Sequence, residues 1–200
     1  MNVLDDLYCR VSFLPDNIYV RAGVNTLTVF LFLLAVGLVI SGISSLISRI
    51  LSMIIGSEAS FVFCNYVTWP GTVHHEFSHA LAAILTGAKV TRISLVPHGD
   101  MLGEVDFIAR GGRILIGLQM TFISIAPIVC GMITESVLYT RVFPLCDSWW
   151  KYALLFYFAV SILLHMTLSR LDLENLSKGI VPSLVVFYGV FLFVEYAKYH

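Results

Sequence analysis

Five stretches of this chain are almost free of charged side chains and are close to the length of a membrane span. They are Ala22–Ser48, Ala59–Ala88, Ile114–Thr134, Tyr152–Ser169 and Gly179–Val194. Because an ionised side chain is costly in hydrocarbon and a spanning helix needs about 20 mainly apolar residues, this pattern predicts about five transmembrane helices. The expected fold class is an all-α polytopic membrane protein.

The segment between the second and third apolar stretches follows another pattern. Lys89–Pro97 is rich in residues that favour strands and ends at a proline, His98–Asp100 is typical of a turn, and Met101–Ile108 fits a returning strand. We therefore expect a small β-hairpin between the second and third helices.

The composition agrees with a membrane protein. Of the 200 residues, 58% are apolar and only 12% are charged, whereas a soluble domain carries about 25% charged residues. The formal net charge of -1 provides no basic face, which excludes nucleic-acid binding. The four cysteines are scattered without a CxxC pair, so we expect free thiols.

The distribution of lysine and arginine predicts the orientation in the membrane. If the N-terminus is cytosolic, most of the 12 basic residues face the cytosol, namely Arg10, Arg21, Lys89, Arg92, Arg110, Arg113, Arg170 and Lys178. The others are Arg49, Arg141, Lys151 and Lys198. This bias predicts a cytosolic N-terminus and a cytosolic hairpin. The first 21 residues lack the features of a cleavable signal peptide, so we expect the first helix to be retained.

The second apolar stretch contains the motif His75-Glu76-Phe77-Ser78-His79, and Pro70-Gly71 just upstream predicts that the helix of this motif begins near Thr68 or Trp69. On a helix, His75 and His79 are about 40° apart around the axis and about 6 Å apart along it, so both imidazoles can reach one metal ion. Glu76 lies on the same side, where it can take a proton from a metal-bound water. HExxH also arises by chance in charged helices, but ionisable groups inside a membrane span usually serve a function.

Two histidines need a third protein ligand to form a catalytic zinc site. Asp172 is favoured because it lies in a polar break after the fourth apolar stretch, although it would also serve to cap a short helix starting at Leu173. Glu135 is the main rival, and the other acidic candidates are Asp100, Glu104, Asp106, Asp147 and Glu174. We expect structural roles for His74, His98 and His165, with support of a metal ligand as the alternative for His165.

These features together resemble the site-2 protease (M50-type) family of intramembrane zinc metalloproteases, especially its compact sporulation-type members. The matching pieces are HEFSHALAAILTGAKV at 75–90, Leu102–Val105 at the end of the hairpin, Ala126-Pro127 followed by Gly131, and Asp172. The resemblance covers about 68–180 of a single domain at 1–200. An extra N-terminal helix at about 22–48 and an extra C-terminal span at about 179–197 complete that domain.

The resemblance implies that His75, His79 and Asp172 bind one Zn2+ ion and that Glu76 is the general base. It also implies that the hairpin, at about Val90–Phe107, holds the substrate as an extended strand, which suits a transmembrane helix that must unwind before hydrolysis. The side chains expected to contact substrate are Val90, Ile93, Leu95, Leu102, Val105 and Asn175.

Two positions depart from the family's pattern. Ser78 stands where the family usually has a glycine before the second histidine, and Asp172 is followed by Leu173 where a glycine is common. The first change keeps a small side chain, whereas the second makes Asp172 the weakest part of the ligand set.

The resemblance implies a multi-pass protein of a prokaryotic cell (inner) membrane that hydrolyses a peptide bond in a transmembrane or membrane-adjacent substrate. Its partners would be this substrate, the lipid bilayer and a regulatory membrane protein, because no ligand-sensing domain is apparent. One alternative is a non-enzymatic membrane protein that binds or transports a metal ion, which predicts stoichiometric zinc without cleavage. Another is a degenerate protease-like scaffold, which predicts that Asp172 lies far from the histidines.

Overall fold

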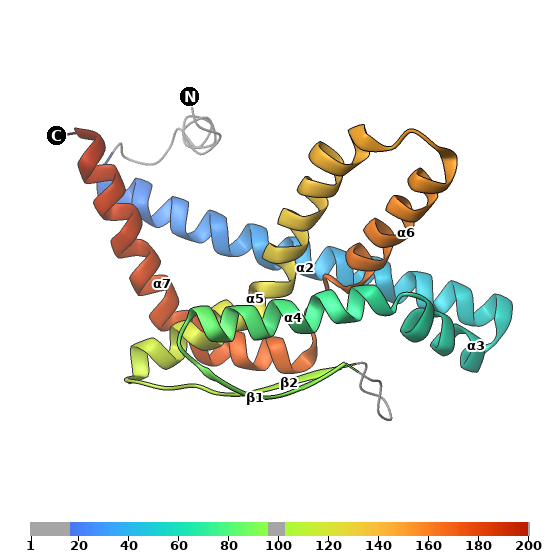
Figure 1. Ribbon diagram of the computed structural model, residues 1–200. Coiled ribbons are helices and arrows are strands. Elements are labelled where there is room, and N and C mark those ends of the chain that lie inside the picture. The colour runs from blue at the N-terminus through green and yellow to red at the C-terminus, as the bar shows by residue number, and fades with distance from the viewer. Residues whose placement is uncertain (1–16, 96–102, 200) are drawn as a thin grey trace.

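The computed structural model describes residues 17–95 and 103–199, which form helices and one β-hairpin (Figure 1). The first half contains α2 (Ile18–Ile55), α3 (Ser57–Val62), the π-helical η1 (Phe63–Val67), α4 (Trp69–Leu85), β1 (Lys89–Ser94) and β2 (Glu104–Ile108). The second half contains α5 (Arg113–Val137), the π-helical η2 (Leu138–Val142), the 3-10 helix η3 (Phe143–Leu145), α6 (Trp149–His165) and α7 (Arg170–Tyr199). The helical fold and the small antiparallel hairpin are therefore confirmed.

Among the described residues, three helical segments are long and apolar enough to cross a membrane. They are Ile18–Ile55, Arg113–Leu145 and Arg170–Lys198. The helix α6 is apolar but shorter, with 17 residues, and α4 also has 17 residues. The protein is thus an integral membrane protein, while the count of five spans stays a prediction.

The second apolar stretch is divided into several elements, and the helix that carries its HExxH motif is α4. The helix α2 continues to Ile55 and stops at Gly56, whose φ of 85° is favourable only for glycine. The short helices α3 and η1 follow, and the chain leaves helical geometry at Thr68 before α4 begins. The start of α4 at Trp69 agrees with the expected position, because Pro70 lacks an N–H and suits the first helical turn.

The helix α5 lies at the centre of the fold. Half of its most apolar stretch is buried inside the protein, compared with 6% for α2 and 11% for α7. Its Gly117 approaches α7 closely, since a Cβ there would lie 2.2 Å from Cγ of Pro182. Both α5 and α7 change direction along their length (Figure 1), and each contains a proline, Pro127 or Pro182.

The two chain segments that enter and leave the hairpin are both hydrogen-bonded to α5. The fully buried Gln119 accepts a hydrogen bond from the Arg110 N–H, 2.8 Å away, and donates one to the Thr86 carbonyl, 2.9 Å away. Thr86 precedes β1 and Arg110 follows β2, so a single amide side chain anchors both strands. Ile93 pairs with Val105 in the sheet, which is irregular between Val90 and Arg92. The predicted turn at His98–Asp100 lies outside the described residues.

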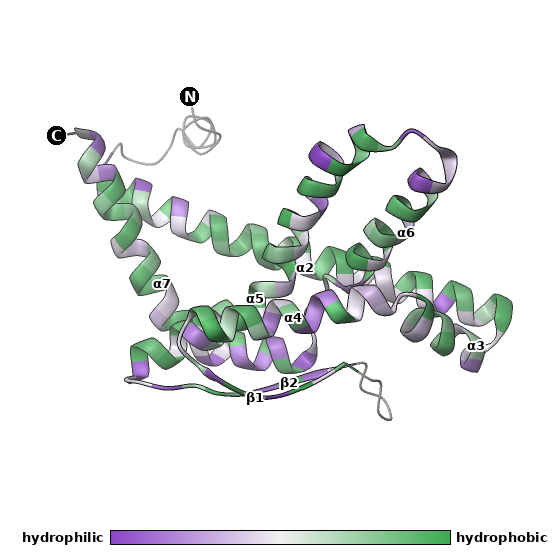
Figure 2. Ribbon diagram, viewed as in Figure 1, coloured by the Kyte–Doolittle hydropathy of each residue, from purple (hydrophilic) through white to green (hydrophobic). Residues whose placement is uncertain are grey.

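The polar residues are concentrated in one region of a mostly apolar molecule. Figure 2 shows hydrophilic residues where α4, the first turns of α7 and the hairpin come together, whereas α2 and the second half of α7 are largely hydrophobic. Of the four cysteines, Cys64, Cys130 and Cys146 are free thiols, as predicted, and Cys9 lies outside the described residues. The polar region therefore marks the place to look for chemistry.

Candidate metal centre

The first turn of α4 is docked directly against α6. The N–H of Gly71 donates to Oγ of Ser161 over 2.8 Å, and the same hydroxyl donates to the Thr68 carbonyl over 2.8 Å. A Cβ at Gly71 would lie 2.0 Å from the Ser161 carbonyl oxygen, so only glycine permits this approach. The close packing places His75, one turn later, beside the C-terminal end of α6.

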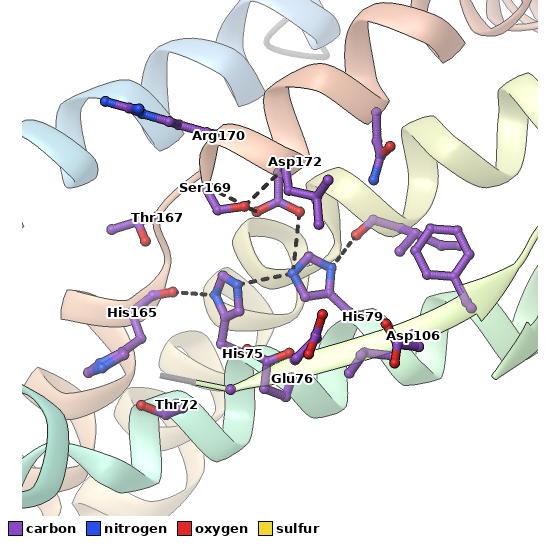
Figure 3. A pocket seen from close by; sticks show the side chains of 17 residues that line it. Thr72, His75, Glu76, His79, Asp106, His165, Thr167, Ser169, Arg170 and Asp172 are labelled. Carbon is purple, nitrogen blue, oxygen red and sulfur yellow. Dashed lines mark hydrogen bonds and ion pairs between the residues drawn. The ribbon is translucent and has the colours of Figure 1, made fainter. Parts of the chain in front are cut away.

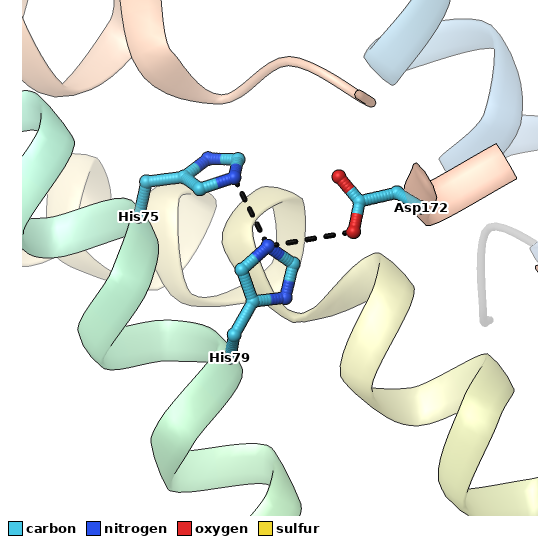
Figure 4. Close-up of side chains that lie close together, drawn as sticks. All are labelled: His75, His79 and Asp172. Atoms are coloured by element: carbon cyan, nitrogen blue, oxygen red, sulfur yellow. Dashed lines mark hydrogen bonds and ion pairs between the residues drawn. The ribbon is translucent and has the colours of Figure 1, made fainter. Parts of the chain in front are cut away.

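His75 and His79 bring their Nε2 atoms within 3.0 Å of each other (Figure 4). The Nδ1 atom of His75 lies 2.6 Å from the His165 carbonyl, and that of His79 lies 2.8 Å from the Ile123 carbonyl. A carbonyl only accepts hydrogen bonds, so Nδ1 is the donor in each ring and the Nε2 lone pair remains free. Two lone pairs that face each other in this way are suited to a shared cation.

Asp172 comes from the start of α7 and joins the two histidines (Figure 4). Its Oδ1 lies 3.4 Å from Nε2 of His79, while its Oδ2 accepts hydrogen bonds from the backbone N–H and the hydroxyl of Ser169. The Asp172 N–H in turn donates to Oγ of Ser169 over 3.0 Å, which completes a reciprocal capping box.

The two roles considered for Asp172, metal ligand and helix cap, do not exclude each other. One carboxylate oxygen caps a helix while the other faces the imidazoles. The capped helix differs from the expected one, however. It begins at Arg170 and is 30 residues long, so the expectation of a short helix starting at Leu173 was wrong. The reason is that Ser169, and not Asp172, occupies the position before the first turn.

Glu76 lies next to the histidine pair and is covered by the hairpin (Figure 3). Its side chain is buried, with 7% of the residue exposed. A Cβ at Gly103, just before β2, would lie 2.7 Å from Cγ and 2.9 Å from Oε1 of Glu76. The absence of a side chain at Gly103 thus leaves room for the Glu76 carboxylate.

A cavity of about 530 Å³ connects these groups (Figure 3). Its lining comes from α4, the hairpin, α5, the end of α6 and the start of α7. The lining residues are Thr72, His75, Glu76, His79, Gly103, Glu104, Val105, Asp106, Phe107, Ile123, His165, Thr167, Ser169, Arg170, Leu171, Asp172 and Asn175. Polar groups on several walls make the cavity suitable for water and for a peptide backbone.

The residues predicted to contact substrate are distributed unevenly around this cavity. Val105 and Asn175 line it, whereas Val90, Ile93 and Leu95 are not among the lining residues. Leu102 lies outside the described residues. The side of the hairpin that faces the cavity is therefore the β2 side.

Of the other acidic candidates for the third ligand, Glu104 and Asp106 line the same cavity but do not belong to the cluster of potential ligands. Among the described residues, His75, His79 and Asp172 form the one group of three potential ligands within reach of a single ion. Asp147 is in the exposed loop before α6, where a hydrogen bond from Lys151 lowers its pKa. Glu174 pairs with Lys178, and Glu135 is absent from the cavity lining. Asp100 lies outside the described residues.

The comparison with known families identifies one that covers most of the chain. Residues 59–198 match the model of a family described as Peptidase M50B-like, and this range contains the HExxH motif, the hairpin and Asp172. The chain belongs to the Peptidase M50B-like family. The resemblance to the M50-type site-2 proteases is thereby confirmed at the level of the family. No curated protein and no solved structure matches the chain.

The donor set of this M50B-like protein fits a zinc ion. Two imidazole nitrogens and one carboxylate oxygen, all within 4.8 Å of one another, are the ligand types found in catalytic zinc sites. Each imidazole also donates its Nδ1–H to a carbonyl, as the nitrogen that does not bind metal usually does in ligating histidines. His79 and Asp172 are buried, so these two donor residues are largely shielded from solvent.

Several groups that shape the M50B-like site were not predicted from the sequence. The carbonyls of His165 and Ile123 are backbone acceptors, which no residue type reveals. The role of Ser169 was detectable, because Ser-x-x-Asp is a capping-box sequence. His74 and His165 have interior partners as expected: His74 contacts the Thr134 hydroxyl and His165 contacts the Ser161 carbonyl.

Proposed function

We propose that this protein is an intramembrane zinc metalloprotease that hydrolyses a peptide bond in a transmembrane or membrane-adjacent substrate. The observation that carries the proposal is the meeting of three donors, Nε2 of His75, Nε2 of His79 and Oδ1 of Asp172, beside Glu76 in a shared cavity. Membership of a peptidase family supports the same reaction.

The residues of the site have distinct roles in this reaction. His75, His79 and Asp172 hold the zinc ion, which when bound acidifies a water molecule and polarises the peptide carbonyl. Glu76 takes a proton from the attacking water and passes it to the leaving amine. The carbonyls of His165 and Ile123 keep the two rings in the tautomer whose Nε2 binds metal.

The substrate lies along the β2 side of the hairpin. Gly103 to Phe107 line the cavity, whereas no residue of β1 does. A transmembrane helix hides its own amides and must unwind before it is cleaved, and an extended segment forms backbone hydrogen bonds with a strand edge. Asn175, on α7, lines the same cavity, which supports a contact between its side chain and the substrate.

The test uses the full-length protein in proteoliposomes with a panel of single-span peptides, whose cleavage is followed by mass spectrometry. Glu76→Gln should keep the fold and stoichiometric zinc but lose cleavage, because the amide cannot accept the proton. The matched control is Glu174→Gln, which alters an exposed acid paired with Lys178 and should leave cleavage intact. Cleavage retained in Glu76→Gln would remove Glu76 from the mechanism.

The other functions are separated by the same measurements. Stoichiometric zinc without cleavage of any peptide would favour a metal-binding or transport protein, and absence of zinc would favour a scaffold. The orientation is tested with a tag inserted between Asp100 and Leu102. We expect the tag to be accessible from the cytosolic side, and access only from the opposite side would contradict the proposed topology.

A further inference from the structure

The helix α5 contains a backbone carbonyl that accepts no helical hydrogen bond and is therefore free to bind another group. In an α-helix the carbonyl of residue i accepts the N–H of residue i+4. Four residues after Ile123 stands Pro127, which has no N–H. The Ile123 carbonyl instead accepts the Nδ1–H of His79 over 2.8 Å.

The proline ring has a second effect on this carbonyl. A proline inside a helix crowds the carbonyl four residues before it and turns that carbonyl away from its usual direction. Ile123 and Pro127 are both almost completely buried, which limits the access of water to the oxygen. The carbonyl that supports His75 is free for another reason, because His165 ends α6 and has no following helical turn.

We propose that Pro127 is a positioning residue for the metal site: by leaving the Ile123 carbonyl free, it fixes the His79 ring with Nε2 toward the cation. This inference rests on the proposed zinc site and deepens it. An N–H at position 127 would return the carbonyl to the helical ladder, and His79 would lose the acceptor that fixes its tautomer and orientation.

The test measures zinc affinity of the full-length protein in nanodiscs by competition with a chelator. Pro127→Ala should weaken zinc binding by about 10-fold or more, the range seen when a ligating histidine loses its supporting partner. In the zinc-free protein, 15N NMR should show a smaller fraction of the Nδ1–H tautomer of His79. Unchanged affinity in Pro127→Ala overturns the proposal.

One variant separates the missing N–H from the bend that proline causes. Pro127→lactate replaces the amide with an ester, so it has neither ring nor N–H, and it should recover most of the affinity lost in Pro127→Ala. An affinity as weak as that of Pro127→Ala would overturn the proposal. The matched control is Pro182→Ala in α7, where the residue four positions earlier is Lys178. No histidine in the described part of the chain depends on the Lys178 carbonyl, so zinc affinity should not change.

A further variant covers the case in which Pro127→Ala does not fold. Replacing Ser124 with its α-hydroxy analogue keeps Pro127 and turns the Ile123 carbonyl into a weaker ester acceptor. Reduced zinc affinity supports the proposal, and unchanged affinity overturns it. If the unaltered protein binds no zinc, the proposed function fails. If the unaltered protein binds zinc and the Pro127 and Ser124 variants bind it equally well, only the role of Pro127 fails.

Discussion

The helices α2 and α5 are both apolar enough to cross a membrane, but they have different surroundings. Only 6% of the most apolar stretch of α2 is buried inside the protein, compared with 50% for α5. The buried residues of α5 include the polar Gln119, Thr121 and Ser124. Apolar composition therefore shows that a helix suits the bilayer, but the contacts of its few polar groups show whether it supports a site.

The two helices also differ in what their polar groups contact. In α5, Pro127 and the Ile123 carbonyl take part in the environment of His79. In α2, the buried amide of Asn25 donates a hydrogen bond over 3.4 Å to Glu195, which does not belong to the cluster of potential ligands. We thus expect changes on or around α5 to alter zinc binding or the hairpin, and changes on α2 to alter stability alone.

The largest expected effect is the loss of a ligand from the site supported by α5. His79→Ala should reduce zinc affinity by more than about 100-fold, the upper end of the loss caused by removing only a supporting group. The measurement is chelator competition on the purified protein. His74→Ala, on the same helix but paired with Thr134, and Leu38→Ala, on the exposed face of α2, should retain zinc. A comparable loss in Leu38→Ala would break the contrast between the helices.

An intermediate effect is expected for Gln119→Leu in α5. The change leaves the part-buried Arg110 N–H and Thr86 carbonyl without their partner, and an unpaired polar group that is shielded from water costs about 1–3 kcal/mol. Hydrogen exchange should become faster across β1 and β2, because the hairpin loses its anchor. Asn25→Leu, the buried amide of α2, is the matched control and should leave exchange in the hairpin unchanged.

The smallest effect is expected where α2 touches the core. A Cβ at Gly37 would lie 2.5 Å from Cδ1 of Ile128 and 2.9 Å from Cδ1 of Leu168, so Gly37→Ala should destabilise the fold by about 1–3 kcal/mol through overpacking. Gly42→Ala has nothing within 4 Å and should stabilise α2 by about 0.5–1 kcal/mol. Thermal unfolding in detergent checks the opposite signs, and zinc affinity should be equal in both variants.

The local features of the site were accessible from the sequence. The HExxH spacing predicted that His75 and His79 share one side of a helix, and their Nε2 atoms meet at 3.0 Å. Strand-favouring residues predicted the hairpin, and Pro70 predicted the start of α4. Each of these features depends on backbone geometry over a few residues, so the residue pattern is sufficient.

The division of the second apolar stretch was not accessible in the same way. Hydropathy reflects the cost of placing side chains in lipid, and it does not register whether the backbone continues as one helix. Within that stretch, α3 is followed by the π-helical η1, and the chain leaves helical geometry at Thr68. For Asp172, the cap and the ligand were treated as alternatives, although one carboxylate has an oxygen for each.

The sequence by itself determined that this is a helical membrane protein with a paired-histidine motif, because composition and helical spacing are local properties. Only the tertiary structure decided that Asp172 reaches the histidines and that the carbonyls of Ile123 and His165 hold them. Those contacts join α4 to α5, α6 and α7, segments distant in the chain. Their meeting depends on how the helices pack, bend and end, which residue spacing does not specify.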